Sequence, residues 1–449
     1  MKIAKIIIKG FQQFENFYLD LEDPQTGLPP DKVCFIGPNA TGKSTLLRLI
    51  INLLNRLHTI ASYEQIAGKP FIAVKVHTEA ETFFACANPL SSHLVYYDPL
   101  VEQSEEWQRF VTDPSQQKVP KNFCADYFIY NNPVPGLASG KDLIIDVPAD
   151  ELLRLVNDPP NTTLDKALAL SHNFPIYHVV SISTAAKFWN LLIYLIKKRE
   201  SDYQQYLEDP KNKKKTVEKV KIAFKRNRPE ILPEIGKLWN RVLEKADLEF
   251  DVKAAKIPVQ LNENLRAFVK IKASGNQLPY NSLSSGIRNY IFKLGHIRAL
   301  YFERKIERGF LLVDEPENSL YPDMLYGLID DYLSIIENTQ LFVATHNPII
   351  AAQFEPRERI HLDFDDRGFV TATYGVTPIG DDPNDLLIKD FHVRSVYGKE
   401  GIRNWERFLE LRRLIPKTSN KTRKQQLINE YLEIGNAYNF DPDEIHEKV

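Results

Sequence analysis

A glycine-rich stretch near the N-terminus limits the fold of this chain more sharply than its length or composition does. The stretch is Gly37-Pro38-Asn39-Ala40-Thr41-Gly42-Lys43-Ser44-Thr45, and it fits the pattern GxxxxGK[ST]. It lies between an apolar run at 33–36, predicted to be a buried strand, and an apolar run at 44–57, predicted to be a buried helix. This context predicts an α/β fold with a P-loop core. A chance Gly-rich turn that opens a helix is the weak alternative.

The chemistry of such a loop is the binding of nucleotide phosphates. Glycine lets the backbone fold closely around phosphate oxygens, and the free N–H groups and dipole at the helix start attract an anion. Lys43 is expected to reach the β- and γ-phosphates, and Ser44 is expected to ligate Mg²⁺. The predicted ligands are therefore ATP and Mg²⁺. The candidate nucleotide-binding residues of the loop are Gly37, Asn39, Gly42, Lys43, Ser44 and Thr45.

Two later apolar runs end in polar side chains suited to hydrolysis. The run at 310–313 is followed by Asp314, the candidate Mg²⁺ carboxylate, and by Glu315, the candidate general base for the attacking water. The run at 341–344 leads to His346, a second candidate catalytic residue that would contact the γ-phosphate or the water. Alone, an acidic turn or a lone histidine is an ordinary structural feature. After a P-loop in the same chain, these residues predict an ATPase site.

A fourth motif precedes the acidic strand. Ser284-Ser285-Gly286 forms a predicted turn that opens a helix, and it offers a hydroxyl and free N–H groups to an anion. Ser284 and Gly286 are therefore further candidate nucleotide-binding residues. On the motif alone, an ordinary N-capped helix is the better interpretation.

In this order, the four motifs resemble the Walker A, signature, Walker B and switch-histidine motifs of ABC-type ATPase heads. The long insertion between the first two is similar to that of the SMC, RecF and overcoming-lysogenization-defect group. The opening Ile8-Lys9-Gly10-Phe11-Gln12-Gln13-Phe14-Glu15-Asn16-Phe17 resembles that group's first strand motif, and Asp314-Glu315-Pro316-Glu317-Asn318-Ser319-Leu320-Tyr321-Pro322 resembles its DEPExxLHP motif. The resemblance covers roughly residues 1–60 and 275–375, and the middle only by architecture.

The resemblance implies a shared site between two heads. Ser284 and Gly286 would bind the γ-phosphate of ATP on the opposite head, so hydrolysis would require a head-to-head dimer with two ATP molecules between the heads. Asn318 and Ser319 occupy the position of the segment that crosses that interface. The chain departs from the group's pattern at three positions. Gln12 stands where the group has Arg, Ser285 where it has Gly, and Ile287 where it has Gln or Glu.

The motifs divide the chain into four predicted parts. Residues 1–148 form an N-terminal ATPase lobe with Walker A, and residues 149–249 form a helical insertion too short for a long coiled-coil arm. Residues 250–375 form a C-terminal ATPase lobe with the signature, Walker B and switch histidine. Residues 376–449 form a short helical tail. The predicted fold is an ABC-ATPase head with a mixed sheet.

Composition excludes several other classes of protein. The formal net charge is -2, so a globally basic protein that coats nucleic acid is not indicated. The three cysteines lie far apart, which argues against a disulfide framework or a structural zinc site and predicts a reducing, cytoplasmic location. The longest strongly apolar stretch, 188–196, is far shorter than a membrane span.

The size, compact insertion and short tail resemble the stand-alone ATPases of bacterial anti-phage systems of the Septu, PARIS and retron types. This resemblance implies a homo-oligomeric ATPase that controls a separately encoded effector, often a nuclease. No nuclease activity is expected from this chain, because the tail is too short for a Toprim domain.

Two alternatives stay open. One is a RecF- or SMC-like ATPase that binds DNA, for which the segment 211–228, with nine Lys and Arg residues, is the candidate surface. The other is a regulatory scaffold with negligible turnover.

Overall fold

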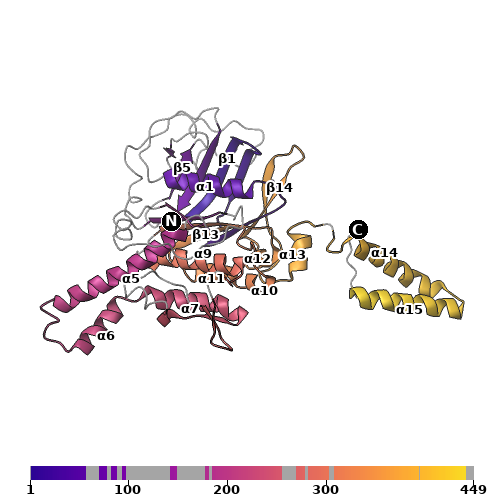
Figure 1. Ribbon diagram of the computed structural model, residues 1–449. Coiled ribbons are helices and arrows are strands. Elements are labelled where there is room, and N and C mark those ends of the chain that lie inside the picture. The colour runs from indigo at the N-terminus through magenta and orange to yellow at the C-terminus, as the bar shows by residue number, and fades with distance from the viewer. Residues whose placement is uncertain are drawn as a thin grey trace. The chain divides into compact units, whose positions relative to one another are not determined.

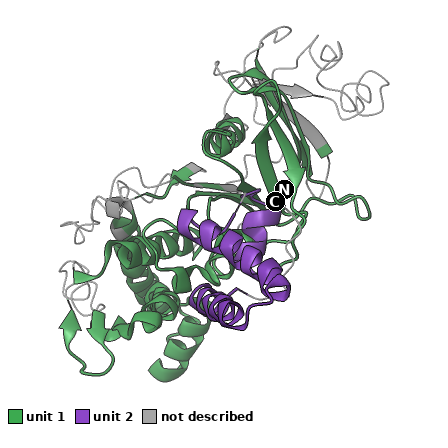
Figure 2. Ribbon diagram, turned by 90° about the vertical axis from the view of Figure 1, so that its right-hand side faces the viewer, with its two compact units in different colours: residues 1–381 green, residues 382–449 purple. Residues whose placement is uncertain are grey.

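The computed structural model of the chain describes residues 2–56, 70–77, 82–87, 94–97, 142–148, 177–181, 185–254, 269–278, 282–302, 308–393 and 395–440. The chain divides into two compact units, residues 1–381 and 382–449 (Figures 1 and 2). The first unit contains the described strands, and the described part of the second is helical. The finer division of the first unit, and the boundary at residue 376, stay predictions.

A seven-stranded mixed sheet forms the centre of the first unit. Its strand order is β15-β14-β3-β13-β12-β7-β8, and every neighbouring pair is parallel except β14 with β15. The central strands are continuous apolar runs, as parallel strands covered on both faces require. The strands are β3 (Lys32–Ile36), β7 (Asp142–Val147), β8 (Tyr177–Val179), β12 (Arg308–Asp314), β13 (Thr339–Ala344), β14 (Arg359–Phe364) and β15 (Val370–Tyr374). The predicted mixed sheet with a P-loop core is confirmed.

A second, antiparallel sheet packs with the first around one helix. Its order is β2-β1-β4-β5-β6, and α1 (Lys43–Arg56) contacts strands of both sheets (Figure 1). Leu46, Ile50 and Leu54 of α1 are fully buried in this core, which explains why the helix is apolar on nearly all sides. The strands are β1 (Lys2–Phe11), β2 (Phe14–Asp20), β4 (Phe71–His77), β5 (Thr82–Ala87) and β6 (Leu94–Tyr97).

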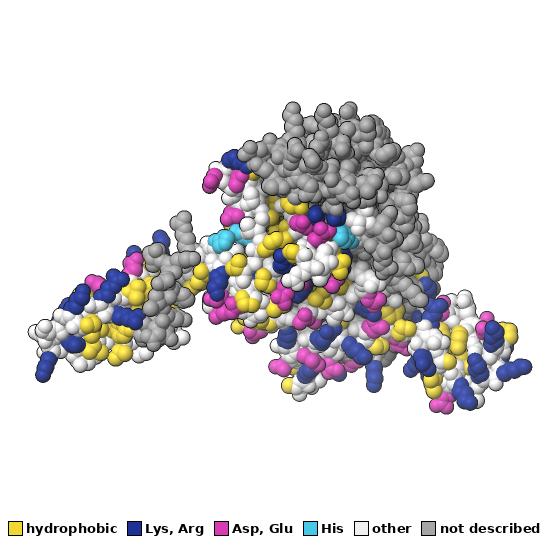
Figure 3. Space-filling model, turned by 180° about the vertical axis from the view of Figure 1, so that it is seen from behind, with side chains coloured by type: hydrophobic (Ala, Val, Ile, Leu, Met, Phe, Trp, Pro, Cys, Tyr) yellow, Lys and Arg dark blue, Asp and Glu magenta, His cyan; other side chains and the backbone are white. Residues whose placement is uncertain are grey.

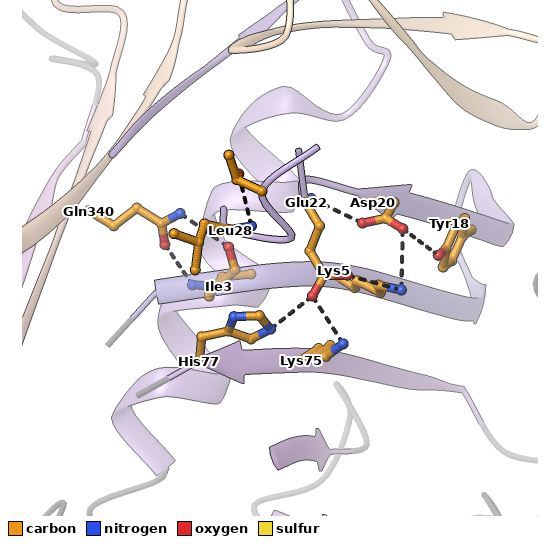
Figure 4. Close-up of polar contacts among 10 residues, drawn as sticks. Ile3, Lys5, Tyr18, Asp20, Glu22, Leu28, Lys75, His77 and Gln340 are labelled. Carbon is orange, nitrogen blue, oxygen red and sulfur yellow. Dashed lines mark hydrogen bonds and ion pairs between the residues drawn. The ribbon is translucent and has the colours of Figure 1, made fainter. Parts of the chain in front are cut away.

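Polar side chains also tie the two sheets together. Gln340 of β13 is fully buried, and its amide bonds both the N–H and the C=O of Ile3 in β1, at 2.7 and 3.1 Å (Figure 4). Nearby, the Glu22 carboxylate lies 3.0 Å from Lys75 Nζ and 2.8 Å from His77 Nε2 (Figure 4). Burial alone would raise the pKa of Glu22, but hydrogen bonds from His77 and Lys75 and the charge of Lys5 lower it to about 2. The carboxylate therefore stays charged and bridges three basic side chains.

The predicted helical insertion, residues 149–249, is helical in most of its described part, with one strand lying wholly inside it. The helices are α5 (Ala185–Glu208), α6 (Val217–Asn227) and α7 (Ile231–Leu243). The exception is β8, at residues 177–179, which was predicted to be helical. This short Tyr-His-Val segment instead pairs in parallel with β7 and forms the edge of the main sheet. Three residues are too few to show a periodicity, so only the pairing identifies the strand.

Further elements complete the first unit. A short turn of helix, η3 (Glu244–Ala246), leads into a three-stranded sheet of β9 (Leu248–Phe250), β10 (Val269–Ile271) and β11 (Gln277–Leu278). The long helix α9 (Ser285–Phe302) packs against α5 and α7. In Figure 1, α9 and the short helices lie on the other side of the main sheet from α1. The short helices are α10 (Pro322–Leu325), α11 (Leu328–Leu333) and α12 (Pro348–Ala351).

The second unit is a helical hairpin with an aromatic core. It contains α13 (Pro383–Lys389), α14 (Lys399–Leu414), η5 (Ile415–Lys417) and α15 (Lys421–Tyr438), and α14 packs against α15. Phe408 stacks on Tyr431 with ring centroids 4.2 Å apart, and Trp405 meets Phe440 edge to face at 4.8 Å. The predicted short helical tail is confirmed. Across the described residues of both units, no helix combines the length and apolarity needed to cross a membrane.

Candidate nucleotide-binding and hydrolysis site

The order of the strands brings three of the predicted motifs to one edge of the main sheet. β13 lies between β3, which leads into the P-loop, and β12, which ends at Asp314. All three strands are parallel, so their carboxyl ends lie at the same edge, where α/β proteins bind ligands. His346 follows β13 and is therefore placed between Lys43 and the acidic pair. The sequence gives the order of these strands along the chain but not their order in the sheet.

The P-loop has a left-handed backbone at three positions. Gly37, Ala40 and Gly42 have φ of 139°, 68° and 86°. A Cβ at Gly37 would lie 2.1 Å from the carbonyl oxygen of Leu362, and one at Gly42 would lie 2.7 Å from Phe14 Cζ, so neither position has room for a side chain. Asn39 is exposed in the loop, and Ser44 and Thr45 lie half-buried in the first turn of α1.

The buried side chain of Lys43 contacts the first residues of the P-loop. Its Nζ donates hydrogen bonds to the carbonyl oxygens of Gly37 and Pro38, both at 2.9 Å, and the residue is only 6% exposed. Burial lowers the pKa of Lys43 to about 8, although the negative charges of Asp314, Glu315 and Glu317 oppose this shift. The lysine is therefore surrounded by acids at the carboxyl edge of the sheet. It is a cation that phosphate oxygens would attract away from the two carbonyls.

Asp314 and Ser44 form the pair of oxygen ligands that Mg²⁺ prefers. The Ser44 hydroxyl is hydrogen-bonded to the Asp314 carboxylate, so the helix start and the end of β12 meet. Burial raises the pKa of Asp314, whereas the Ser44 hydrogen bond and the charges of Arg48 and Lys43 lower it. A half-buried carboxylate beside a hydroxyl fits a hard cation such as Mg²⁺. The structure thus brings together the two residues predicted to ligate the metal.

Glu315 has an unusual backbone that explains how its side chain reaches the site. Its N–H continues the β12–β13 ladder by bonding Ala344 O at 2.8 Å, but its φ is 47°, in the left-handed region. One carboxylate oxygen accepts a hydrogen bond from Asn318 Nδ2 at 3.0 Å, and the other lies 4.0 Å from His346 Nε2. Both Glu315 and His346 are more than a third exposed. The carboxylate is therefore fixed between two side chains yet open to water.

His346 is placed against the P-loop as well as against Glu315. A hydrogen bond joins its side chain to the backbone of Gly37. Burial and the charge of Lys43 lower the pKa of His346, while Glu315 and the Gly37 contact raise it, and the net shift is downward. A lowered pKa favours the neutral imidazole at neutral pH. The geometry can thus bind a polyphosphate, hold a divalent cation and place a carboxylate beside a water molecule.

Comparison with known families agrees with this geometry. The sequence profile of the AAA ATPase domain matches residues 1–119 and 180–351, which is more than half of the chain. The chain belongs to the AAA ATPase domain family. The prediction of an ABC-type P-loop ATPase is therefore confirmed at the level of the family and the fold. The resemblance to the ATPases of anti-phage systems stays a prediction.

Three solved structures of SMC heads are similar to this ATPase. The SMC head bound to the C-terminal winged-helix domain of ScpA has 11% identity and a TM-score of 0.42, and the match covers 84% of this chain and 98% of that one. The SMC head domain from Thermotoga maritima has 12% identity and a TM-score of 0.39, with 84% and 100% covered. The Pyrococcus furiosus SMC head bound to the C-terminal domain of ScpA has 12% identity and a TM-score of 0.39, with 83% and 96% covered.

The signature residues of this ATPase contact their own helix and the segment that follows Glu315. Ser284 is exposed, and its Oγ accepts a hydrogen bond from Ile287 N at 3.4 Å. It therefore caps the start of α9, as expected for an ordinary N-capped helix. Gly286 is buried against the segment that follows Glu315, because a Cβ there would lie 1.8 Å from Ser319 O. Ser319 itself has a φ of 63°. The structure thus packs the start of the signature helix against Ser319, at the end of the segment that begins with Asp314.

Two residues that approach the site were not singled out from the sequence. Gln13, in the β1–β2 turn, directs its Nε2 to Ala40 O of the P-loop at 3.4 Å, whereas the preceding Gln12 is exposed. Glu317 reaches back to the end of β13, where its Oε1 accepts from Thr345 Oγ1 at 2.5 Å and from His346 N at 3.1 Å. The only sequence feature that marks Glu317 is its place as the second Glu of the segment Asp314-Glu315-Pro316-Glu317. Its role depends on a contact across 29 residues of sequence.

We expect Glu317 to act as a positioning residue for His346. Glu317→Ala leaves the Thr345 hydroxyl and the His346 N–H without their acceptor, so the histidine loses its fixed place beside Glu315. The expected result is a kcat for ATP lowered by about tenfold, equivalent to about 1.4 kcal/mol, with little change in ATP affinity. Glu317→Gln keeps an acceptor oxygen and is the matched control that should restore most of the rate. Equal loss in both variants, or loss of ATP binding, would contradict a positioning role.

Proposed function

We propose that this ATPase hydrolyses ATP in a head-to-head dimer, with each active site built from two chains. The observation that carries the proposal is the different surroundings of the predicted motifs. Lys43, Asp314 and Glu315 converge at one edge of the sheet, while Ser284 is exposed and contacts its own helix. A second copy that presented Ser284 and Gly286 across the open edge would complete the phosphate site. The exposure of Glu315 and His346 supports this arrangement, because it leaves them accessible to a partner.

Hydrolysis in this proposal is general-base catalysis of in-line attack by water. The P-loop N–H groups and Lys43 bind the β- and γ-phosphates and stabilise the charge that develops on them. Mg²⁺ held by Ser44 and Asp314 would supply further positive charge at the phosphates. The Glu315 carboxylate takes a proton from the attacking water as its oxygen bonds to the γ-phosphorus, and the bond to the ADP oxygen breaks. His346 orients the γ-phosphate or the water.

The dimer is proposed to control a separately encoded effector, such as a nuclease, in bacterial anti-phage defence. This step rests on the resemblance of the chain's size, compact insertion and helical tail to stand-alone defence ATPases. ATP-dependent closure of two heads would bring the insertions and tails of both chains into a new arrangement, which a bound protein can sense. The proposal places the complex in the cytoplasm. It assigns no nuclease chemistry to this chain.

A second candidate function, a RecF- or SMC-like ATPase that binds DNA, has its own supporting observation. The basic segment 211–228 forms the end of the α5–α6 hairpin, whose rings pack inside at Tyr203 and Phe224, 4.9 Å apart. Its Lys and Arg side chains are exposed, and Arg228 pairs with Asp202 only at 3.8 Å. A cluster of exposed cations suits contact with phosphates.

The mass of the complex distinguishes the two functions. The wild-type chain, expressed with the products of neighbouring genes, would be purified and its native mass measured with and without ATP. A multimer of this chain carrying a second protein supports effector control. A chain that is alone, monomeric without ATP and dimeric with it, whose hydrolysis rises on addition of DNA, supports the DNA-binding alternative. A mass that ATP leaves unchanged at the monomer would contradict the dimeric site itself.

A further inference from the structure

The tip of the α14–α15 hairpin carries a cluster of cations that differs from the rest of the second unit. Six basic residues fall between positions 412 and 424, and the sequence has no Asp or Glu from 411 to 429. We define the basic tip as Arg412, Arg413, Lys417, Lys421, Arg423 and Lys424. Five of the six are exposed, and Lys424 is half-buried. Lys and Arg side chains are prominent over the visible face of this hairpin in Figure 3.

Arginines in the rest of the hairpin form ion pairs with glutamates, whereas the cations of the tip form none with the part of the chain that the structure describes. Arg407 makes a bidentate pair with Glu430, at 2.7 and 3.1 Å, and a further bond to Glu410 at 2.6 Å. Arg403 pairs with Glu400 at 3.3 Å. Within the described residues of this unit, none of the six tip side chains pairs with an acid. An ordinary solvated helix face would intersperse both signs, as the base of this same hairpin does.

The hairpin is built to present its tip as a firm surface. Phe408 of α14 stacks on Tyr431 of α15, and Phe440 packs edge to face against Trp405 and Phe408, away from η5 in the sequence. Asn420 caps the start of α15 by accepting from Arg423 N at 3.1 Å, and Pro416 stiffens the connection. The tip cations are thus held on two packed helices. The packed hairpin sets the backbone positions of the six residues relative to each other.

We propose that the basic tip binds the phosphodiester backbone of a double-stranded nucleic acid. Six cations without intervening acids complement the negative charge of a row of phosphates, and each contact releases condensed counterions. The rings of the unit are committed to its core, so the tip offers no platform on which unpaired bases could stack. Of the tip residues between 412 and 424, only Leu414 is an exposed large apolar side chain, so insertion into a membrane is not favoured. The overall charge of -2 means that the attraction is local.

The test measures binding of the full-length protein to labelled 30-base-pair DNA and RNA duplexes of one sequence, over a range of salt concentrations and without ATP. The tip variant Arg412→Gln, Arg413→Gln, Lys417→Gln is expected to bind about 10- to 100-fold more weakly, with the slope of log affinity against log salt reduced by about three. The variant Lys421→Gln, Arg423→Gln, Lys424→Gln should lose as much. Preferential loss on DNA or on RNA identifies which duplex the tip recognises.

The matched control changes three exposed cations that belong to neither basic segment, Lys237→Gln, Lys245→Gln and Lys253→Gln. The control is expected to keep nearly wild-type duplex affinity, and all variants should keep wild-type thermal stability and basal ATP hydrolysis. Wild-type affinity in both tip variants would overturn the proposal, as would an equal loss in the control. Tighter binding to an acidic peptide or to anionic vesicles than to duplexes would also overturn it and would assign the tip to that partner. Failure of ATP-dependent dimerisation leaves this test unaffected, so the two proposals fail separately.

Discussion

Replacement of Glu315 by Gln is expected to lower the rate of ATP hydrolysis by about 100- to 10,000-fold while ATP still binds. The amide is nearly isosteric with the carboxylate but cannot accept the proton of the attacking water, and loss of a general base costs about this factor. Lys43, Ser44 and Asp314 are untouched, so the phosphates and the cation are still held. ATP should therefore accumulate uncleaved, and the head dimer should persist. Single-turnover hydrolysis and native mass in the presence of ATP measure both effects.

Asn318→Ala provides the matched control for Glu315. It removes the hydrogen bond at 3.0 Å to one oxygen of the Glu315 carboxylate but leaves the base in place. A smaller loss, of about tenfold, is expected from the less restricted carboxylate. If Glu315→Gln hydrolyses ATP as fast as wild type, Glu315 is not the general base. In that case, the rate of Asn318→Ala shows whether the conformation of residues 315–318 affects hydrolysis.

Replacement of Lys43 by Ala is expected to weaken ATP binding by about 100- to 10,000-fold. Two charge-assisted hydrogen bonds to the β- and γ-phosphates would be lost, each contributing about 1.5–3 kcal/mol. The substitution takes a donor from the carbonyl oxygens of Gly37 and Pro38 but also removes a buried charge. These effects oppose each other, so the thermal stability of the nucleotide-free protein should change little. Calorimetric titration with ATP and thermal unfolding check the two parts. Tight ATP binding by a folded Lys43→Ala variant would refute the P-loop assignment.

The pKa of Lys43 gives this prediction a dependence on pH. Burial places that pKa at about 8 in the nucleotide-free protein, and bound phosphates favour the charged amine. The affinity for ATP should therefore be nearly constant between pH 7.5 and 8 and should fall by up to about tenfold per pH unit above this pKa. Lys43→Arg carries a guanidinium that stays charged, so its affinity, although lower at pH 7.5, should not fall in the same range.

Local sequence patterns were sufficient for the P-loop fold, and they selected the candidate site residues, whose roles stay predictions. The spacing of the glycines and Lys43, placed between an apolar strand and an apolar helix, is a short-range pattern with one known structural solution. The structure confirms the elements around it, and it brings Ser44, Asp314, Glu315 and His346 together as expected. The departures were the short strand β8 and the residues Gln13 and Glu317, which no periodicity marks.

The tertiary structure alone decided how these motifs face one another. β13 lies between β3 and β12 because it pairs both with its neighbour β12 and with β3, which is about 300 residues earlier in the chain. This order determines that His346 lies beside Glu315. Glu315 combines the ladder bond to Ala344 with a left-handed backbone, so the direction of its side chain could not be read from residue types. A pattern of apolar residues belongs to a single segment, so the sequence reveals it directly. The order of strands in a sheet and an unusual backbone conformation depend on contacts between segments, so only the tertiary structure reveals them.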